Sequence, residues 1–198
     1  MRTVARDSSA FDLAVEQVRG VVVRPEFRLD EVPAPQRLAP SAFAMTAERV
    51  DLDDDEAYGR FVLLHDPDTV DEWDGTFRAV VFVRAALEPD MLDDPLVQQV
   101  AWSWLEDAIG SADAEVVQLG GTITRTSGTS FGTMSDRPSD GFVEIRASWT
   151  PVPGPSGETD IGAHVRAWVD ILAHATGLPP LPEGVAHVGA RRSRRAGG

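Results

Sequence analysis

Residues 128–132 read GTSFG and match Gly-x-Ser-x-Gly, the pattern around the nucleophilic serine of many hydrolases. That serine needs a sharp turn between a buried strand and a helix, which holds its hydroxyl above a parallel sheet. Here the following residues, TMSDRPSDG, contain Pro138 and several turn formers, and no helix fits them. Asp170 and His174 follow in the chain order of a catalytic triad. Without a strand–turn–helix context, however, the pattern predicts the loop of a β-hairpin.

The composition excludes several other kinds of catalytic chemistry. The chain has no cysteine, which excludes a thiol nucleophile and a cysteine-bound zinc. All 18 of its basic Lys and Arg residues are arginine, which excludes a Schiff-base lysine and the lysine of a P-loop. We therefore expect neither a serine hydrolase nor a thiol enzyme, a P-loop NTPase or a Schiff-base enzyme. We also expect no cofactor.

The acidic stretch DLDDDEAYG, residues 51–59, resembles a calcium-binding loop only in part. Such a loop needs glycine at its sixth position and a bidentate glutamate at its twelfth, but Glu56 and Val62 stand there. His65 precedes a run of carboxylates that could join it at a divalent ion. A histidine that ends a strand beside a turn usually has a structural role, so we expect no metal site.

The strand–turn–strand segment that follows is a candidate pocket. His65, Trp73, Asp74 and Arg78 combine a titratable ring, an aromatic ring, a carboxylate and a guanidinium within a short stretch. Ligand pockets place a few convergent polar groups of these kinds among apolar side chains. We therefore hypothesise that these four residues line a pocket.

A second candidate site is the polar face of the predicted hairpin. Thr122, Thr124 and Thr126 alternate with apolar residues in one strand, and Glu144 and Arg146 do so in the next. Because successive side chains of a strand point to opposite faces, these five residues share one face. It is interpreted either as a solvated sheet surface or as a binding face for a ligand or partner. The core face would hold Val117, Leu119, Ile123, Val143, Ile145, Ala147 and Trp149.

Hydrophobic periodicity predicts three helices, near residues 9–22, 94–109 and 159–176. Ser9 and Asp94 are the expected N-caps of the first two helices. Strand-like segments lie between the helices in an order that does not alternate strand with helix, which argues against a parallel doubly wound sheet. We expect a single α+β domain with a mostly antiparallel sheet of five or six strands, covered by the three helices.

The segment TFRAVVFVRAAL, residues 76–87, is the strongest strand candidate. It is apolar on both faces, with Val80 and Phe82 opposite the other apolar residues. This pattern is typical of a central strand that is covered on both sides. The segment before it, residues 66–75, is expected to form one helical turn and then to reverse the chain at its end.

We expect residues 1–7 to be a flexible N-terminus, residues 8–180 to form the domain, and residues 181–198 to be a disordered basic tail. The net charge is −14, and four of the 18 arginines lie in the last eight residues. Such an acidic body disfavours nucleic acid and suits a basic protein partner. We expect no signal peptide, because residues 1–20 contain no unbroken apolar region. Since no apolar stretch reaches membrane-spanning length, we also expect no membrane association and a cytoplasmic location.

Several unusual segments occur in order along the chain. They read VPAPQRLAPSAFA, RFVLLHDP, WDGTFRAVVFVRAALEPDM and GGTITRTS…FG…EIRASWTPV. From about Phe11 to Pro180 the chain resembles an uncharacterised actinobacterial family, the domain of unknown function numbered three thousand. Genomes rich in G and C would explain why the chain lacks lysine and asparagine. The resemblance implies no activity, cofactor or functional residue.

Two classes of function stay open at this point. The first is a non-enzymatic cytoplasmic binding or accessory protein, favoured because no set of residues converges on a catalytic arrangement. The second is an enzyme or small-molecule-binding domain that uses a pocket near His65 or the face from Thr122 to Arg146. A deep pocket beside either set would favour the second class, and a flat face would favour the first.

We predict that Ser130 is not a nucleophile. After incubation with a fluorophosphonate probe, intact-protein mass spectrometry should show no stoichiometric adduct, because a hairpin loop provides neither a general base nor an oxyanion hole. A stoichiometric adduct that maps to Ser130 would contradict this prediction, and a Ser130→Ala variant is the matched control.

Overall fold

The computed structural model describes residues 3–52, 56–155 and 157–179, which form three α-helices and one six-stranded sheet. The strand order is β1-β2-β3-β4-β6-β5, and all neighbouring pairs are antiparallel. The predicted α+β class with an antiparallel sheet is confirmed. In chain order the main elements are α1 (Thr3–Arg19), β1 (Phe27–Val32), β2 (Ser41–Arg49), β3 (Ala57–Val70), β4 (Gly75–Ala86), α2 (Val97–Ser111), β5 (Val116–Gly128), β6 (Asp140–Pro151) and α3 (Ile161–Ala175).

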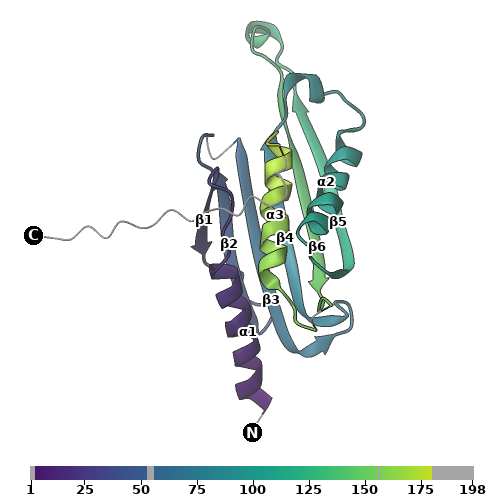
Figure 1. The fold of residues 1–198 in the computed structure, drawn as a ribbon. Helices are drawn as coiled ribbons and strands as arrows, with labels where there is room; N and C mark the ends of the chain where they lie inside the picture. The colour runs from purple at the N-terminus through teal and green to yellow at the C-terminus, as the bar shows by residue number, and fades with distance from the viewer. Residues whose placement is uncertain (1–2, 53–55, 156, 180–198) are drawn as a thin grey trace, which may run out of the picture.

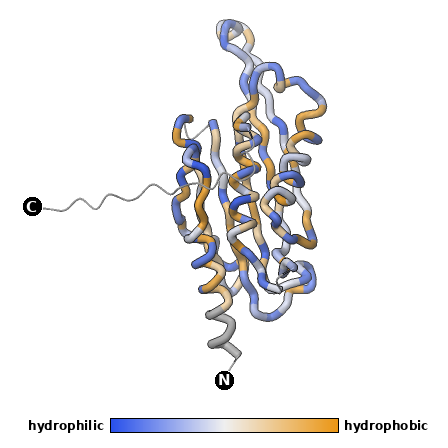
Figure 2. Tube along the Cα trace, viewed as in Figure 1, coloured by the Kyte–Doolittle hydropathy of each residue, from blue (hydrophilic) through white to orange (hydrophobic). Residues whose placement is uncertain are grey.

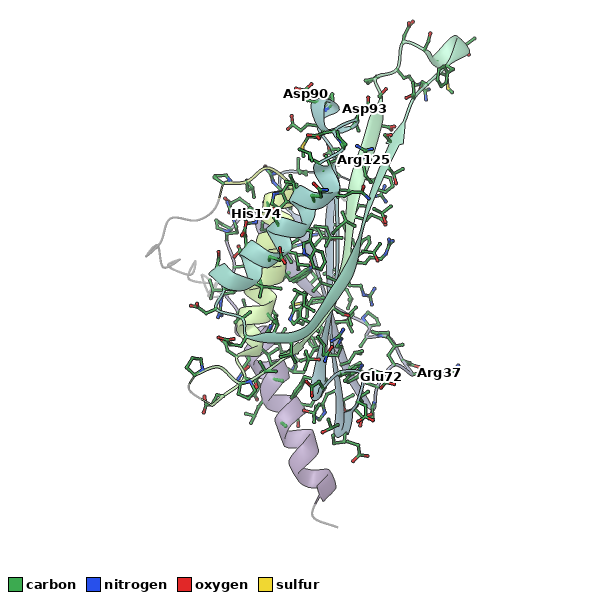
Figure 3. All side chains as sticks on the ribbon, turned by 90° about the vertical axis from the view of Figure 1, so that its right-hand side faces the viewer. Arg37, Glu72, Asp90, Asp93, Arg125 and His174 are labelled. Atoms are coloured by element: carbon green, nitrogen blue, oxygen red, sulfur yellow. The ribbon has the colours of Figure 1, made fainter. Side chains whose placement is uncertain are left out.

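All three helices lie on the same face of the sheet (Figures 1 and 3). α3 packs on β3, β4 and β6 at the centre, α2 packs on β5 and β6, and α1 packs beside α3. Between the two layers lies the main core, which includes Phe61, Leu63, Leu105, Ile145 and Leu172. Figure 2 shows hydrophilic residues gathered in the loops at the two ends of the sheet. In the middle of β4 and β6, every second residue is buried against the helices.

The opposite face, which we call the open face, is covered by no helix in the described part of the chain. One small apolar cluster on this face is nevertheless buried, and its centre is Ala44, Val62 and Leu64. Trp73 from the turn between β3 and β4 packs against it, as do residues of the segment 32–39. Figure 3 shows Arg37 and Glu72, from these two connections, on the side of the sheet away from the helices.

The central strand β4 differs from its prediction in one respect. Residues 76–87 were expected to be covered on both faces, and that expectation is wrong. Val81 and Val83 are buried against the helices, whereas Val80 and Phe82 are partly exposed on the open face. Three helices cover only one side of a six-stranded sheet, so apolar residues on the other side stay accessible.

All three helices lie close to their predicted positions, but α1 and α2 begin at other residues than predicted. α3 has Asp160 as its N-cap, and the carboxylate accepts a hydrogen bond from the Ala163 amide. α1 begins at Thr3, so Ser9 lies inside it instead of capping it. α2 begins at Val97, after a turn in which the Asp94 carboxylate accepts a hydrogen bond from the Leu96 amide.

The predicted helical turn within residues 66–75 is wrong, because β3 continues as a strand to Val70. The pairing with β4 shifts between His65 and Val70, and the chain then reverses at Asp74, whose φ is 56°. The predicted tail, residues 181–198, lies outside the described residues. Within the described ranges, no helix combines the length and apolarity needed to cross a membrane.

The two edge strands, β1 and β5, differ in character. β1 carries exposed ion pairs, including those from Arg19 to Glu31 and from Arg28 to Asp30. In β5 the pairing with β6 shifts between Val117 and Gly120, and Gln118 has a positive φ of 52°. The amide of Gln98 in α2 donates to the carbonyl oxygen of Ile123, so α2 also contacts this edge.

α3 is positioned on the sheet by a close contact between Trp168 and Gly59. The indole of Trp168 is fully buried, packs on Phe61 with ring centroids 5.7 Å apart, and donates to the Phe82 carbonyl oxygen. A Cβ atom at Gly59 would lie 3.0 to 3.2 Å from three indole atoms. Glycine at this position therefore lets the helix approach the sheet closely.

A second buried contact joins α3 to β6. The Trp149 indole N–H donates to Nδ1 of His164 at 3.0 Å, and both residues are buried. Because Nδ1 accepts this bond, the ring is held in its neutral form. Burial lowers the pKa of His164 to about 4, since the charged imidazolium would lose its hydration.

We predict that Gly59→Ala lowers the free energy of unfolding by about 1 to 3 kcal/mol, because the new methyl group overpacks the Trp168 indole. The matched control is Gly110→Ala in α2, where a Cβ would meet nothing within 4 Å. That change should stabilise the protein by about 0.5 to 1 kcal/mol, the usual gain when alanine replaces a helical glycine. Urea unfolding of both variants gives the comparison, and equal effects would contradict the packing contact.

We also predict that His164 makes the fold sensitive to mild acid. Its folded pKa of about 4 lies below the ordinary value of 6.5, so the stabilisation is present above about pH 6.5 and is lost as the pH falls towards 4. From pH 7 to pH 4.5 this one group should cost about 2 to 3 kcal/mol.

The variant His164→Asn tests the acid sensitivity. Its amide oxygen can accept the Trp149 bond without titrating, so its loss of stability between these two pH values should be smaller by that amount. The measurement is urea unfolding of both proteins at both pH values. Parallel losses would show that His164 is not the titrating group.

Candidate functional site

The register of the sheet arranges the side chains of the open face in rows that run across the strands. One row, which we call the arginine row, consists of Arg60, Phe82, Arg146 and Thr122 from β3, β4, β6 and β5. The adjacent row, which we call the small-residue row, consists of Val62, Val80, Ser148 and Gly120. On the other side of the small-residue row, the next row includes Leu64 and Arg78. Short side chains thus lie between two rows of longer ones.

This difference in side-chain length leaves a cavity of about 520 Å³ on the open face. Its lining includes both the small-residue row and the arginine row. The floor is apolar, from Val62, Val80 and Phe82, and the polar lining consists of two guanidiniums and two hydroxyl groups. This size and composition suit a small organic ligand.

Two guanidinium groups border the cavity. Arg146 is exposed, forms an ion pair with Glu144, and lies over the Phe82 ring, 5.1 Å from its centroid. Arg60 donates to the carbonyl oxygen of Pro33 at 3.0 Å. A carbonyl oxygen orients a guanidinium without neutralising it, so Arg60 keeps its positive charge for a ligand.

Two further arginines, Arg78 and Arg84, lie on this face, and Arg84 stands directly opposite Glu144 in the register of β4 and β6. Arg78 donates to the side-chain oxygens of Ser148 and Thr150 and to the Gln118 carbonyl oxygen. Burial lowers the pKa of Arg78, because these neutral groups do not replace the hydration of its charge. Arg84 lies over the Phe142 ring at 3.8 Å, and its buried Nε has no hydrogen-bond partner within the described part of the chain.

The part of the open face around the cavity therefore has a charge opposite to that of the chain. Among residues 58–64, 78–84 and 144–150 on this face, four arginines are accompanied by a single carboxylate, that of Glu144. Further along the same rows, Glu48 in β2 and Asp30 in β1 both pair with Arg28. The chain as a whole carries a net charge of −14. A local excess of guanidinium groups on an acidic protein attracts anions to one place.

The five residues of the predicted polar face are on the open face. Thr122 and Arg146 line the cavity, while Thr124 and Glu144 lie in the next row and Thr126 lies towards the end of the hairpin. The cavity residues of β3 and β4, Arg60, Val62, Val80 and Phe82, were not identified as a site from the sequence. The signal that could have revealed them is the second apolar face of β4.

The other predicted set is divided between the two faces of the sheet. His65 is buried on the helix side, between Phe11 and Phe77, at ring-centroid distances of 5.8 and 4.5 Å. Arg78 and Trp73 lie on the open side, where the Trp73 carbonyl oxygen accepts a hydrogen bond from Thr150. Asp74 is an exposed turn residue. The structure thus does not bring these four residues into one pocket.

The residues of the apparent triad are also separated. Ser130 lies in the loop between β5 and β6, which extends beyond the ends of α2 and α3 (Figure 1). The residues after it form a short 3-10 turn, Gly132–Met134, instead of an α-helix. The loop therefore lacks the architecture of a nucleophile elbow.

Asp170 and His174 lie four residues apart on α3 and border a cavity with Arg24. Burial raises the pKa of Asp170, because its charged form would lose hydration. Within the described residues, no group of three or more acidic, histidine or cysteine side chains could hold a metal ion.

The fold and the open face define the protein as an α+β domain with helices on one side of an antiparallel sheet and a basic groove on the other. Residues 7–186 match the family described as Protein of unknown function (DUF3000), and the chain belongs to that family. No curated protein and no solved structure matches the chain.

Proposed function

We propose that the protein is a non-enzymatic binding protein whose open face takes a small organic anion. The observation that carries the proposal is the local reversal of charge around the cavity: four arginines with one carboxylate among residues 58–64, 78–84 and 144–150 of this face, on a chain of net charge −14. Burying or partly burying unpaired guanidinium groups is unfavourable unless a partner compensates them. An anion in the cavity would supply that partner for Arg60 and would compete with Glu144 for Arg146.

The lining of the cavity supports binding more than catalysis. Its polar side chains are those of Arg60, Thr122, Arg146 and Ser148, and its remaining lining is apolar or glycine. A general acid or base must lie within hydrogen-bond reach of the reacting group, and it is usually a histidine or a carboxylate. The lining provides hydrogen-bond donors and charge, which orient a ligand.

The cellular setting is part of the proposal. A chain without cysteine fits the reducing cytoplasm, and a chain without lysine and asparagine fits an actinobacterial source with a genome rich in G and C. The acidic remainder of the surface suits a basic protein partner, which would bind away from the open face.

We predict opposite effects of two neighbouring substitutions on the affinity for anilinonaphthalene sulfonate, measured by fluorescence titration. Arg146→Gln should weaken binding about tenfold or more, because a charge-assisted hydrogen bond to the sulfonate is lost. Glu144→Gln should strengthen binding several-fold, because Arg146 loses its competing carboxylate.

Both variants must keep the urea unfolding midpoint of the parent protein, since this dye also binds loosened cores. The exposed pair formed by Arg166 and Asp160 offers the control: Arg166→Gln removes an arginine far from the cavity lining and should leave the affinity unchanged. Equal affinities in the parent and both open-face variants would refute the proposed function.

A further inference from the structure

We infer that the ligand of the open face is an amphipathic monoanion, a carboxylate on an elongated apolar body that lies across the strands along the small-residue row, and that Gly120 admits it. The inference rests on the proposed function and adds the chemical class and the orientation of the ligand. Three features of the groove support it: the length of the row, its closed end, and the glycine at its open end.

The small-residue row has the length of a medium-chain acyl group or of two linked aromatic rings. It runs from Val62 in β3 across β4 and β6 to Gly120 in β5, which is three inter-strand spacings, or about 14 Å. Its floor is mostly apolar, so an apolar body removes apolar surface from water along the whole row. Inorganic phosphate would leave that surface exposed.

The row is closed at the β3 end. There Val62 and Val80 join the apolar cluster of Ala44 and Leu64, against which Trp73 packs. The guanidiniums of Arg60 and Arg146 belong to the arginine row, which runs beside the small-residue row. A carboxylate bound by these guanidiniums therefore places the apolar body of the ligand along the floor of the cavity. Since Arg146 is already paired with Glu144, the groove favours a single negative charge over a polyphosphate.

Gly120 has no structural reason to be glycine. Its φ is not in the left-handed region, and a Cβ built on it would meet nothing within 4 Å. The adjacent Gly121 is different, because a Cβ there would lie 2.4 Å from the carbonyl oxygen of Arg146. Gly121 is thus required for strand pairing, whereas the missing side chain at Gly120 leaves open space at the end of the cavity.

The experiment uses isothermal titration of the full chain with decanoate, butyrate, decanol and inorganic phosphate. For the parent protein we expect decanoate to bind at least about a hundredfold more tightly than butyrate, because each buried methylene adds affinity. Decanol lacks the carboxylate and phosphate lacks the apolar body. Each should therefore bind at least about tenfold more weakly than decanoate.

The variant Gly120→Leu then tests the orientation, with Gly120→Ala as its matched control. The leucine side chain should fill the open end and weaken decanoate binding about tenfold or more, whereas butyrate binding should stay unchanged. Alanine should have little effect on either ligand. Neither variant should unfold below the parent midpoint, because a Cβ at this position has room and replacing a strand glycine is itself mildly stabilising.

Each part of the proposal would be contradicted by a different binding result. If no anion binds, or if Arg146→Gln changes nothing, the proposed function fails. If butyrate and phosphate bind as tightly as decanoate and respond to Arg146→Gln, the open face binds anions but the apolar body is wrong. Unchanged decanoate binding by Gly120→Leu would overturn the placement along the row. Tighter binding of a single-stranded oligonucleotide than of decanoate would overturn the ligand class.

Discussion

The packing of α3 against the middle of the sheet is the interaction on which the rest of the structure depends. This helix contacts β3, β4 and β6 and is buried on almost every side, so it forms the centre of the core instead of its cover. Two tryptophans fix its position, Trp168 against Gly59 and Trp149 through His164. Because α1 and α2 both pack against α3, the whole helical layer gathers on one side, and the other side of the sheet is left without a layer.

The sequence was informative where a pattern has only one physical solution. The alternation of Val143, Ile145 and Ala147 in β6 allows only one buried face, and these residues are buried as predicted. The periodicity of α3 likewise placed a helix correctly, although this helix is buried on more than the one predicted face. β4 was misread because apolar residues on two faces are equally compatible with two covering layers and with one layer plus an accessible groove. Only the placement of the helices, which is a tertiary property, separates these alternatives.

The candidate site was predictable to a similar degree. Alternation alone placed Thr122, Glu144 and Arg146 on one face. It could not show that Arg60 and Phe82 lie beside them, because cross-strand neighbours depend on strand order and register. Likewise, closeness in sequence suggested that His65 and Arg78 share a pocket, but the pleat sends them to opposite sides of the sheet. The net charge also hid the basic groove, since an average over the chain says nothing about its distribution.

The contrast between the two edges of the sheet has a consequence for how the protein behaves at high concentration. An unprotected edge strand is a template on which further chains can add and build fibrils. Here the β1 edge carries ionised side chains such as Arg28 and Glu31, and the β5 edge is bent at Gln118 and contacted by Gln98 from α2. Neither edge is a flat apolar ribbon. The protein can therefore keep an apolar groove accessible on the face of its sheet without offering an edge strand for polymerisation. The surface that is exposed for a ligand is thus a different one from the strand edges whose exposure would lead to amyloid.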